Sequence, residues 1–202
     1  MKVVMIRHFQ TPGNLERRYV GRTDEPLLEG EGLIRMAEEK RNRIQTLGKP
    51  DCVIASPMKR CIQTANLLFP GEEPLLCEKM RECDFGLFEG KNYEELGDLP
   101  VYQEWLDSRG TIPFPEGESH EAFKARCVEG FAEMAAELVE KRCETAAMVV
   151  HGGTIMAVLS RFDRGDSEFY DWQAENGGGY VISLDEAAWG RGQKEFREIE
   201  RL

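Results

Sequence analysis

The sequence predicts a three-layer α/β/α sandwich with a mostly parallel central sheet, and two observations support that prediction. Short apolar, β-branched stretches alternate along the chain with longer segments whose apolar residues recur at helical spacing. Such alternation is typical of parallel strands connected by helices. The length of 202 residues and the 41% of hydrophobic residues match one globular unit of ordinary composition. We therefore expect a single domain over residues 1–202.

The first half of the chain is expected to contribute two strands and two helices. An apolar run at 2–6 suits a buried strand, and Asn14 is placed to cap a short helical turn. Gly48 follows a segment of helical periodicity, and Ser56-Pro57 is a strong helix start because serine caps well and proline favours the first helical position. The expected order is a strand at 2–6, a helical turn at 14–18, a loop at 19–31, a helix at 32–47, a strand at 51–55 and a helix at 56–69.

The second half is expected to complete the sheet and to add a long helix. Phe123, Cys127 and Phe131 recur every four residues and define one apolar stripe of that helix. The expected order is an extended segment at 75–80, a helical turn at 93–96, a helix at 101–108, a Pro/Gly loop at 109–117, an amphipathic helix at 118–142, a strand at 146–150, a helix at 154–162, a strand at 180–184 and an edge strand at 196–202.

The charge balance argues against two classes of partner. The chain carries 26 Lys and Arg against 37 Asp and Glu, which gives a formal net charge of −11. Nucleic acids and anionic membranes both require a basic face, so we expect neither as a partner. A small anionic substrate remains compatible with this charge if it binds in a local cationic pocket.

The remaining composition predicts a soluble cytoplasmic protein with reduced thiols. No apolar run reaches the ~20 residues that span a bilayer, and the apolar N-terminus stops at Arg7, too early for a signal peptide. The six cysteines contain no C-x-x-C pair, so we expect neither disulfides nor a structural zinc site. No other metal or cofactor is expected, and the protein would be a monomer or a homodimer.

Chemically capable residues follow three of the predicted strands. Arg7 and His8 end the first, Arg60 lies one turn into the helix after the second, and His151 follows the third. Because ligands of open α/β sheets bind beyond the carboxyl ends of the strands, these four side chains would meet in one cleft. A neutral imidazole can attack phosphorus while guanidinium groups bind the phosphate oxygens. A helix that starts near Gly152 would direct its backbone N–H groups at the same anion.

The same segments resemble the motifs of the histidine phosphatase superfamily, the phosphoglycerate mutase-like proteins. The resemblance extends from residue 1 to about 185, and its four main motifs occur in the family's order. They are Arg7-His8-Phe9-Gln10-Thr11, similar to R-H-G-x-T; Ser56 through Ala65, similar to S-P-L-x-R-x-x-x-T-A; Met80 through Gly90, similar to L-x-E-x-x-x-G-x-x-E-G; and His151-Gly152-Gly153.

The resemblance implies a role for each candidate residue. His8 would be the nucleophile that accepts the phosphoryl group, and Glu82 would be the proton donor and then the base for water. The other implied contacts to the phosphate or substrate come from Arg7, Arg60, His151, Asn14, Gly152, Gln10 and Arg22. The resemblance implies no metal ion.

Three positions leave alternatives open. Glu78, Asp84 and Glu89 lie in the same acidic segment as Glu82 and compete with it for the acid–base role. His120 follows a Gly-Glu-Ser element, and we expect it and Ser119 to be capping or pocket-wall residues. Phe9 stands where the family usually has glycine, so it would either line the pocket mouth or displace the turn.

Spacing favours a phosphatase over a mutase. Glu82 and His151 are 151 − 82 = 69 positions apart, which resembles the shorter phosphatase branch of the family. The loop 21–27 together with 114–119 is similar to the α-ribazole-5′-phosphate phosphatases of cobalamin synthesis. The alternatives are a phosphoglycerate mutase, a broad sugar-phosphate phosphatase, and a catalytically silent member that binds a phosphorylated ligand.

Overall fold

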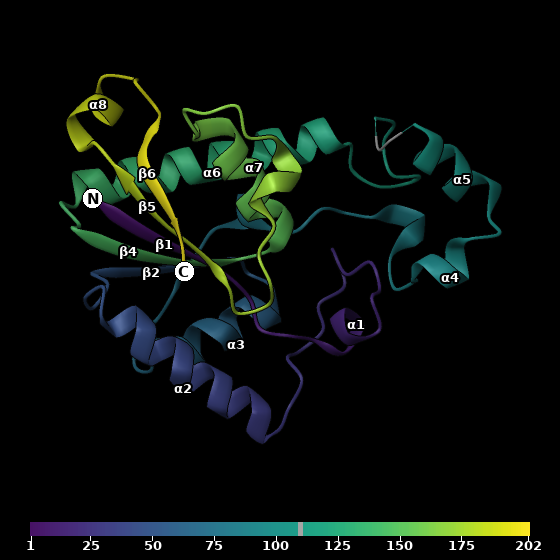
Figure 1. The fold of residues 1–202 in the computed structure, drawn as a ribbon, viewed down its shortest axis with the longest axis horizontal. Coiled ribbons are helices and arrows are strands. Elements are labelled where there is room, and N and C mark those ends of the chain that lie inside the picture. The colour runs from purple at the N-terminus through teal and green to yellow at the C-terminus, as the bar shows by residue number, and fades with distance from the viewer. Residues whose placement is uncertain (109–110) are drawn as a thin grey trace.

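The computed structural model describes residues 1–108 and 111–202, and its centre is one six-stranded sheet (Figure 1). The strand order is β3-β2-β4-β1-β5-β6. The pairs β1·β4, β2·β4 and β2·β3 are parallel, whereas β5 pairs antiparallel with both β1 and β6. The strands are β1 (Lys2–Arg7), β2 (Cys52–Ala55), β3 (Leu75–Leu76), β4 (Thr145–Val150), β5 (Gly179–Leu184) and β6 (Phe196–Arg201).

Helices cover both faces of the sheet, which confirms the predicted sandwich (Figure 1). Alternate residues of β1 point to opposite faces, as in any strand. Val3 and Met5 belong to the core under α6, α7 and α8, whereas Val4 and Ile6 belong to the core under α2 and α3. The covering helices are α2 (Glu31–Gln45), α3 (Lys59–Leu68), α6 (His120–Glu140), α7 (Gly152–Phe162) and α8 (Glu186–Gly190).

A third, aromatic cluster lies beside the sandwich, where Figure 1 shows α4 and α5 set apart from the sheet. Phe88, Tyr102 and Phe114 are buried in it, and Trp105 packs against them. We call residues 83–108 the side lobe. Its elements, and the remaining short ones, are η2 (Gly86–Phe88), α4 (Tyr93–Leu96), α5 (Pro100–Asp107), α1 (Pro12–Leu15), η1 (Glu78–Met80) and η3 (Phe169–Trp172).

The structure corrects two predicted helix starts. Thr11, not Asn14, caps α1, and Asn14 is the third helical residue that completes a capping box. Ser56 does not cap α3, which begins at Lys59 after Met58. The Ser56 hydroxyl is engaged by His151 instead. A serine before a proline indicates a chain turn, but the tertiary partner decides what its hydroxyl binds.

Other boundaries differ by a few residues or lie outside the description. The extended segment at 75–80 is only the two-residue strand β3 followed by η1. Ser119 caps α6, so that helix starts two residues later than predicted. Residues 109–110 of the predicted Pro/Gly loop lie outside the described residues. Neither α8 nor η3 was predicted. Within the described part of the chain, no helix is both long and apolar enough to cross a bilayer.

Candidate active site

The two histidines of the motifs lie side by side at the ends of neighbouring strands. β1 pairs in parallel with β4, and Arg7 lies opposite Val150. A histidine follows each of these two residues, so the register places His8 next to His151. The His8 backbone N–H donates to the Val150 carbonyl at 3.0 Å, and the ring centroids of His8 and His151 are 5.3 Å apart. Both side chains are buried, with exposed fractions of 4% and 0%. The predicted meeting of the histidines is therefore observed.

The His8 ring is held in one tautomer. Its Nδ1 lies 2.6 Å from the backbone carbonyl oxygen of Phe9. A carbonyl can only accept a hydrogen bond, so Nδ1 carries the proton and Nε2 keeps its lone pair. Burial lowers the pKa of His8 to about 3, and the positive charges of Arg60 and Arg7 act in the same direction. His8 is therefore a neutral imidazole with a free lone pair at neutral pH.

His151 is anchored by hydroxyl and thiol neighbours. Its Nε2 lies 2.8 Å from the Ser56 hydroxyl, and the Cys61 sulfur is 3.5 Å from the same nitrogen. Burial lowers the pKa of His151 well below its ordinary value, and Arg60 and His8 lower it further. The sequence predicted the position of His151 but not the Ser56 contact, since nothing in a helix-start motif points to a histidine 95 residues away.

Arg60 is fully buried and held by backbone carbonyls. Its Nη1 donates to the Thr23 carbonyl at 2.7 Å and its Nη2 to the Gly21 carbonyl at 2.9 Å. Glu89 stabilises that loop, because its carboxylate accepts from Gly21 N–H at 3.1 Å, Arg22 N–H at 2.8 Å and the Thr23 hydroxyl at 2.9 Å. The buried Arg60 Nε has no hydrogen-bond partner within the described residues. Arg60 thus has one fixed donor that is still unsatisfied.

Arg7 provides a second unsatisfied guanidinium donor. Its Nη1 donates to the Ala174 carbonyl at 2.8 Å, while its buried Nε is unpartnered within the described residues. A Cβ added to Gly152 would lie 3.4 Å from Arg7 Nε, so the guanidinium lies against the first residue of α7. Two guanidinium donors beside a helix N-terminus form an arrangement that can bind a tetrahedral oxyanion.

Glu82 is the carboxylate nearest to this arrangement. Its Oε1 accepts from Cys83 N–H at 3.0 Å and its Oε2 from Gly153 N–H at 3.2 Å. Burial raises the pKa of Glu82, although those two N–H donors and the nearby arginines oppose the shift. Glu82 lines a cavity that Arg7 also lines, whereas none of the competitors Glu78, Asp84 and Glu89 does. Geometry therefore favours Glu82 over all three.

The three weaker sequence candidates differ in position. Asn14 lies at the site, because its Oδ1 accepts from Asn176 Nδ2 at 3.1 Å and that amide also donates to the His8 carbonyl at 3.0 Å. Arg22 is 62% exposed and lies 3.5 Å from the Asp84 carboxylate, in a depression that does not include Arg7. Gln10 is half-buried and does not line the cavity. Sequence reasoning missed Asn176, whose one signal is its place before three glycines.

Phe9 does not line the pocket mouth, so that sequence expectation is wrong. Its ring is fully buried in the core under α2 and α3. The backbone does not need a positive φ at this position, and the Phe9 N–H donates to the Thr64 hydroxyl at 2.9 Å. Space for the ring comes from Gly177, where φ is +74° and an added Cβ would lie 2.7 Å from the ring. The aromatic side chain therefore packs behind the site and leaves His8 unobstructed.

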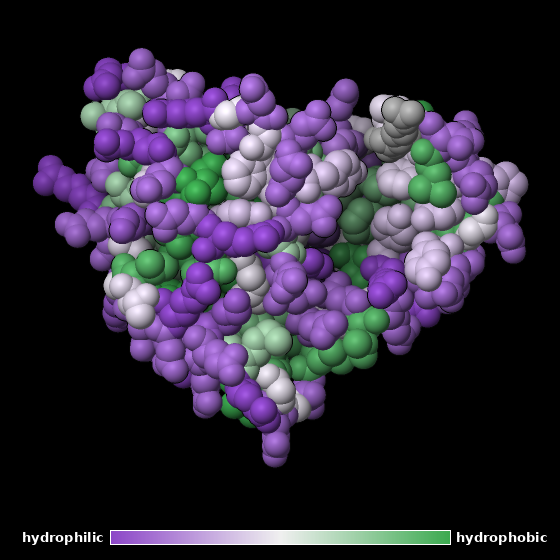
Figure 2. Space-filling view, in the orientation of Figure 1, coloured by the Kyte–Doolittle hydropathy of each residue, from purple (hydrophilic) through white to green (hydrophobic). Residues whose placement is uncertain are grey.

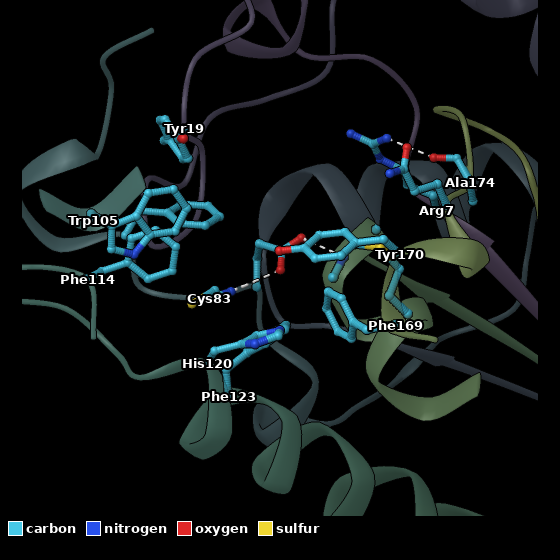
Figure 3. Close-up of a pocket in the computed structure, with 16 residues that line it drawn as sticks. Arg7, Tyr19, Cys83, Trp105, Phe114, His120, Phe123, Phe169, Tyr170 and Ala174 are labelled. Carbon is cyan, nitrogen blue, oxygen red and sulfur yellow. Dashed lines mark hydrogen bonds between the residues drawn. The ribbon is translucent and has the colours of Figure 1, made fainter. Parts of the chain in front are cut away.

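A cavity of about 410 Å³ opens next to Arg7 and Glu82 (Figure 3), and His8, His151 and Arg60 are not among the residues that line it. Arg7, Glu82, Gly152 and Gly153 line its inner end. Figure 2 shows the same face hollowed between the sandwich and the side lobe, with apolar residues in the hollow. We call this space the aromatic cavity, because its remaining lining includes Tyr19, Phe85, Trp105, Phe114, His120, Phe123, Phe169 and Tyr170.

Two sequence expectations at the cavity rim are confirmed. Ser119 is a capping residue, since its hydroxyl accepts from Ala122 N–H at 3.0 Å, and His120 is a wall residue of the aromatic cavity.

Among the residues that the structure describes, no group of three or more His, Cys, Asp or Glu side chains is arranged to hold a metal ion. The ionisable groups that do converge are two neutral histidines, two arginines and one carboxyl group.

Comparison with known proteins shows the family. A family model described as the histidine phosphatase superfamily (branch 1) matches residues 3–191. The chain belongs to this superfamily. Within it, the Hydrogenobacter thermophilus protein named "Putative phosphoserine phosphatase 2" is 28% identical over 162 residues, or 78% of this chain and 76% of the relative. A 2,3-bisphosphoglycerate-dependent phosphoglycerate mutase of Bifidobacterium longum is 27% identical over an alignment of 193 positions, which covers 80% of this chain and 77% of the relative.

A solved member of known fold superimposes over the whole chain. The crystal structure of the α-ribazole phosphatase from Shigella flexneri matches with a TM-score of 0.82 at 22% identity, and the match covers 100% of this chain and 96% of that one. This similarity confirms the phosphoglycerate mutase-like fold. The names of these three proteins specify three different substrates or reactions, so membership of the superfamily by itself leaves the substrate open.

Proposed function

We propose that this protein is a metal-independent phosphoric monoester hydrolase that works through a phosphohistidine at His8. The observation that carries the proposal is the His8 tautomer, in which the Phe9 carbonyl holds the Nδ1 proton and leaves the Nε2 lone pair free. The low pKa of about 3 keeps that lone pair unprotonated at neutral pH. A nucleophilic imidazole needs both conditions.

In the first half-reaction, His8 Nε2 attacks the phosphorus of the ester and the bond from phosphorus to the ester oxygen breaks. The Nε–H groups of Arg7 and Arg60, which have no partner among the described residues, donate to the phosphoryl oxygens, together with the N–H of Gly152 at the start of α7. His151, whose ring centroid is 5.3 Å from that of His8, and Asn14, which Asn176 connects to the His8 carbonyl, complete the proposed set of phosphate contacts. These donors are fixed before substrate arrives, so they stabilise the developing charge without reorganisation.

Glu82 supplies the proton that the departing oxygen needs. Burial raises its pKa, which favours the protonated carboxyl in the free enzyme. In the second half-reaction the resulting carboxylate takes a proton from water as the water oxygen attacks phosphorus and the bond from phosphorus to Nε2 breaks. Inorganic phosphate leaves, and both His8 and Glu82 return to their starting protonation states.

The substrate is a small-molecule phosphate monoester, and α-ribazole 5′-phosphate is the first compound to test. Phosphoglycerate mutase activity is the second candidate, favoured by the 27% identity to a mutase over 80% of this chain. Broad sugar-phosphate hydrolysis is the third. Because the aromatic cavity presents few groups that could hold a second anionic portion of a substrate, hydrolysis of a monoester is our first choice.

Two assays decide among these activities. Release of phosphate from an aryl phosphate, unaffected by EDTA, with a phosphohistidine that is lost in His8→Asn, would support the proposal. Absence of turnover would instead indicate a silent phospho-ligand-binding member. Transfer between 3-phosphoglycerate and its bisphosphate primer that exceeds phosphate release would identify a mutase. Activity that EDTA abolishes and Mg²⁺ restores would contradict the mechanism.

A further inference from the structure

The aromatic cavity has two facing walls that come from distant parts of the chain (Figure 3). One wall belongs to the side lobe and its neighbours, where Trp105 stacks on Phe114 at 4.8 Å between ring centroids and 26° between planes. The other belongs to η3, where Phe169 and Tyr170 pack edge to face at 5.0 Å. Figure 3 shows Trp105 on one side and Tyr170 on the other, with the open space between them.

The charges of the cavity are confined to its inner end. Among the described lining residues, Arg7 and Glu82 are the ones that carry a guanidinium or carboxyl group, and both belong to the proposed phosphate site. His120 also lines the wall, but burial lowers its pKa, as does Lys124, so it is neutral at pH 7. A carboxylate placed between the aromatic walls would lose hydration and would face the negative faces of the rings.

Tyr170 is exposed in a way that suggests a missing contact. It is 61% exposed, although its neighbours Phe169 and His120 pack on one another at 4.6 Å. The Tyr170 ring is nearly parallel to His120, with 19° between planes at 6.5 Å. An exposed aromatic ring at the rim of an aromatic cavity is typical of a surface that a ligand covers.

We propose that the aromatic cavity selects the leaving group of the substrate, and that it accepts a planar aromatic or heteroaromatic ring without an anionic substituent, with Tyr170 as a specificity-determining residue. This inference rests on the proposed function, because the phosphate end of the ligand is placed by Arg7. The ring lies between the Trp105 wall and the Tyr170 wall and covers Tyr170. The volume of about 410 Å³ exceeds the ~150 Å³ that holds one benzene, so a ring system with a short linker fits.

Binding of phosphonates tests the inference without requiring turnover. The probes are 3-phenylpropylphosphonate, 3-cyclohexylpropylphosphonate and 4-phosphonobutyrate, which share the anionic head and differ in the group that enters the cavity. Calorimetry should show the phenyl compound binding about threefold to tenfold more tightly than the cyclohexyl compound, the range expected of favourable aromatic pairs. The carboxylate compound should bind at least ~10-fold more weakly than the phenyl compound.

Two tyrosine variants identify the residue responsible. Tyr170→Ala should bring the phenyl-to-cyclohexyl affinity ratio to about one. Tyr93→Ala is the matched control, because Tyr93 is 53% exposed on α4 and does not line the cavity, and it should keep the wild-type ratio. Thermal melting of both variants checks that folding is unchanged. Equal or tighter binding of the cyclohexyl compound, tightest binding of 4-phosphonobutyrate, or an unchanged ratio in Tyr170→Ala would overturn the inference.

Turnover of matched esters separates this inference from the proposed function. The alcohols released from 2-phenylethyl phosphate and 2-cyclohexylethyl phosphate are similarly basic, so a difference in kcat/KM reports the cavity and not the leaving-group chemistry. We expect the same preference in kcat/KM as in phosphonate affinity. Hydrolysis of both esters without a preference would refute the cavity inference alone. A phenyl preference in binding with no hydrolysis of either ester would refute the proposed function alone.

Discussion

The inner histidine site and the aromatic cavity touch each other but are built in opposite ways. His8, His151 and Arg60 are at most 4% exposed, and each is held by strand-end backbone, a loop carbonyl or a buried hydroxyl. In the cavity, Tyr170 is 61% exposed and no hydrogen bond holds its ring within the described residues. The difference indicates that the groups of the proposed reaction are preorganised and protected from water, whereas Tyr170 at the rim of the cavity is free to adapt.

Their origins in the chain differ as well. The inner site combines residues at the ends of adjacent parallel strands, whose register places them together. The cavity walls combine side chains from the side lobe, the start of α6 and η3. Substitutions in the inner site should therefore affect every substrate, and substitutions in the cavity should affect some substrates more than others.

The largest effect that this comparison predicts belongs to His8. His8→Ala removes the imidazole that we propose as the nucleophile, so kcat/KM should fall at least ~10³-fold for alkyl and aryl esters alike. Steady-state kinetics with both ester types measures the loss, and circular dichroism checks the fold. Residual activity within tenfold of that of the wild-type protein would contradict the phosphohistidine mechanism. A loss confined to one ester would break the distinction between the two regions.

The rate loss caused by removing the Glu82 acid is predicted to depend on how basic the leaving oxygen is and not on the shape of the leaving group. Glu82→Gln should slow hydrolysis of an alkyl phosphate by about 10²–10⁴-fold and that of an activated aryl phosphate much less, because the aryl oxygen departs without a proton. Rapid quench with the aryl ester should show the phosphoenzyme accumulating, since water activation is also impaired. Asp84→Asn is the control, because Asp84 is 37% exposed and outside the aromatic cavity. Equal slowing of both esters by Glu82→Gln, without accumulation, would move the acid–base role to another carboxyl group.

Phe9 tests whether the core behind the inner site affects stability or catalysis. Phe9→Ala should lower the free energy of unfolding by about 3–5 kcal/mol, because it empties a fully buried volume between Gly177 and α3. Urea unfolding measures the loss, and kcat of the folded fraction should not increase. A variant that gains activity with little loss of stability would show that the Phe9 ring obstructs the site after all.

The buried histidines predict a specific dependence of stability on pH. The pKa of His8 is about 3 in the folded chain and about 6.5 when unfolded, so the unfolded state binds more protons between those values. The contribution of His8 to stability is therefore complete above pH 6.5 and is lost as pH falls toward 3, by about 1.4 kcal/mol per pH unit. Urea unfolding of wild type and His8→Asn at pH 7.0 and 4.5 isolates this slope. Parallel pH profiles for the two proteins would mean that His8 is protonated more easily than its burial implies.

Much of the inner site was predictable because its residues directly follow sequence patterns typical of a strand or of a helix start. Arg7, His8 and His151 directly follow apolar strands, and Arg60 follows a Ser-Pro helix start, so their convergence needs only the geometry of a parallel sheet. Glu82 needed the family motif to distinguish it from its acidic neighbours. No local sequence pattern predicts that the buried Arg60 guanidinium donates hydrogen bonds to backbone carbonyls of the loop at 20–23.

Other contacts could not be predicted because both partners are ordinary residues far apart in the chain. Asn176 joins His8 and Asn14 across more than 160 residues, and Ser56 binds His151 instead of capping a helix. Phe9 shows the same limit. From the sequence, phenylalanine in place of the family's glycine suggests a side chain at the pocket mouth or a displaced turn. The packing against Gly177 shows instead that the ring lies in the core.

By itself, the sequence determined the alternation of strands and helices, the histidines and arginines at the strand ends, and hence the family chemistry, since these depend on local periodicity and on residues next to it. Tertiary structure alone decided the tautomer of His8, the direction of Phe9 and the walls of the aromatic cavity. The physical reason is that hydrogen-bond partners and cavity shape arise from side chains brought together by folding, across separations that no local pattern encodes.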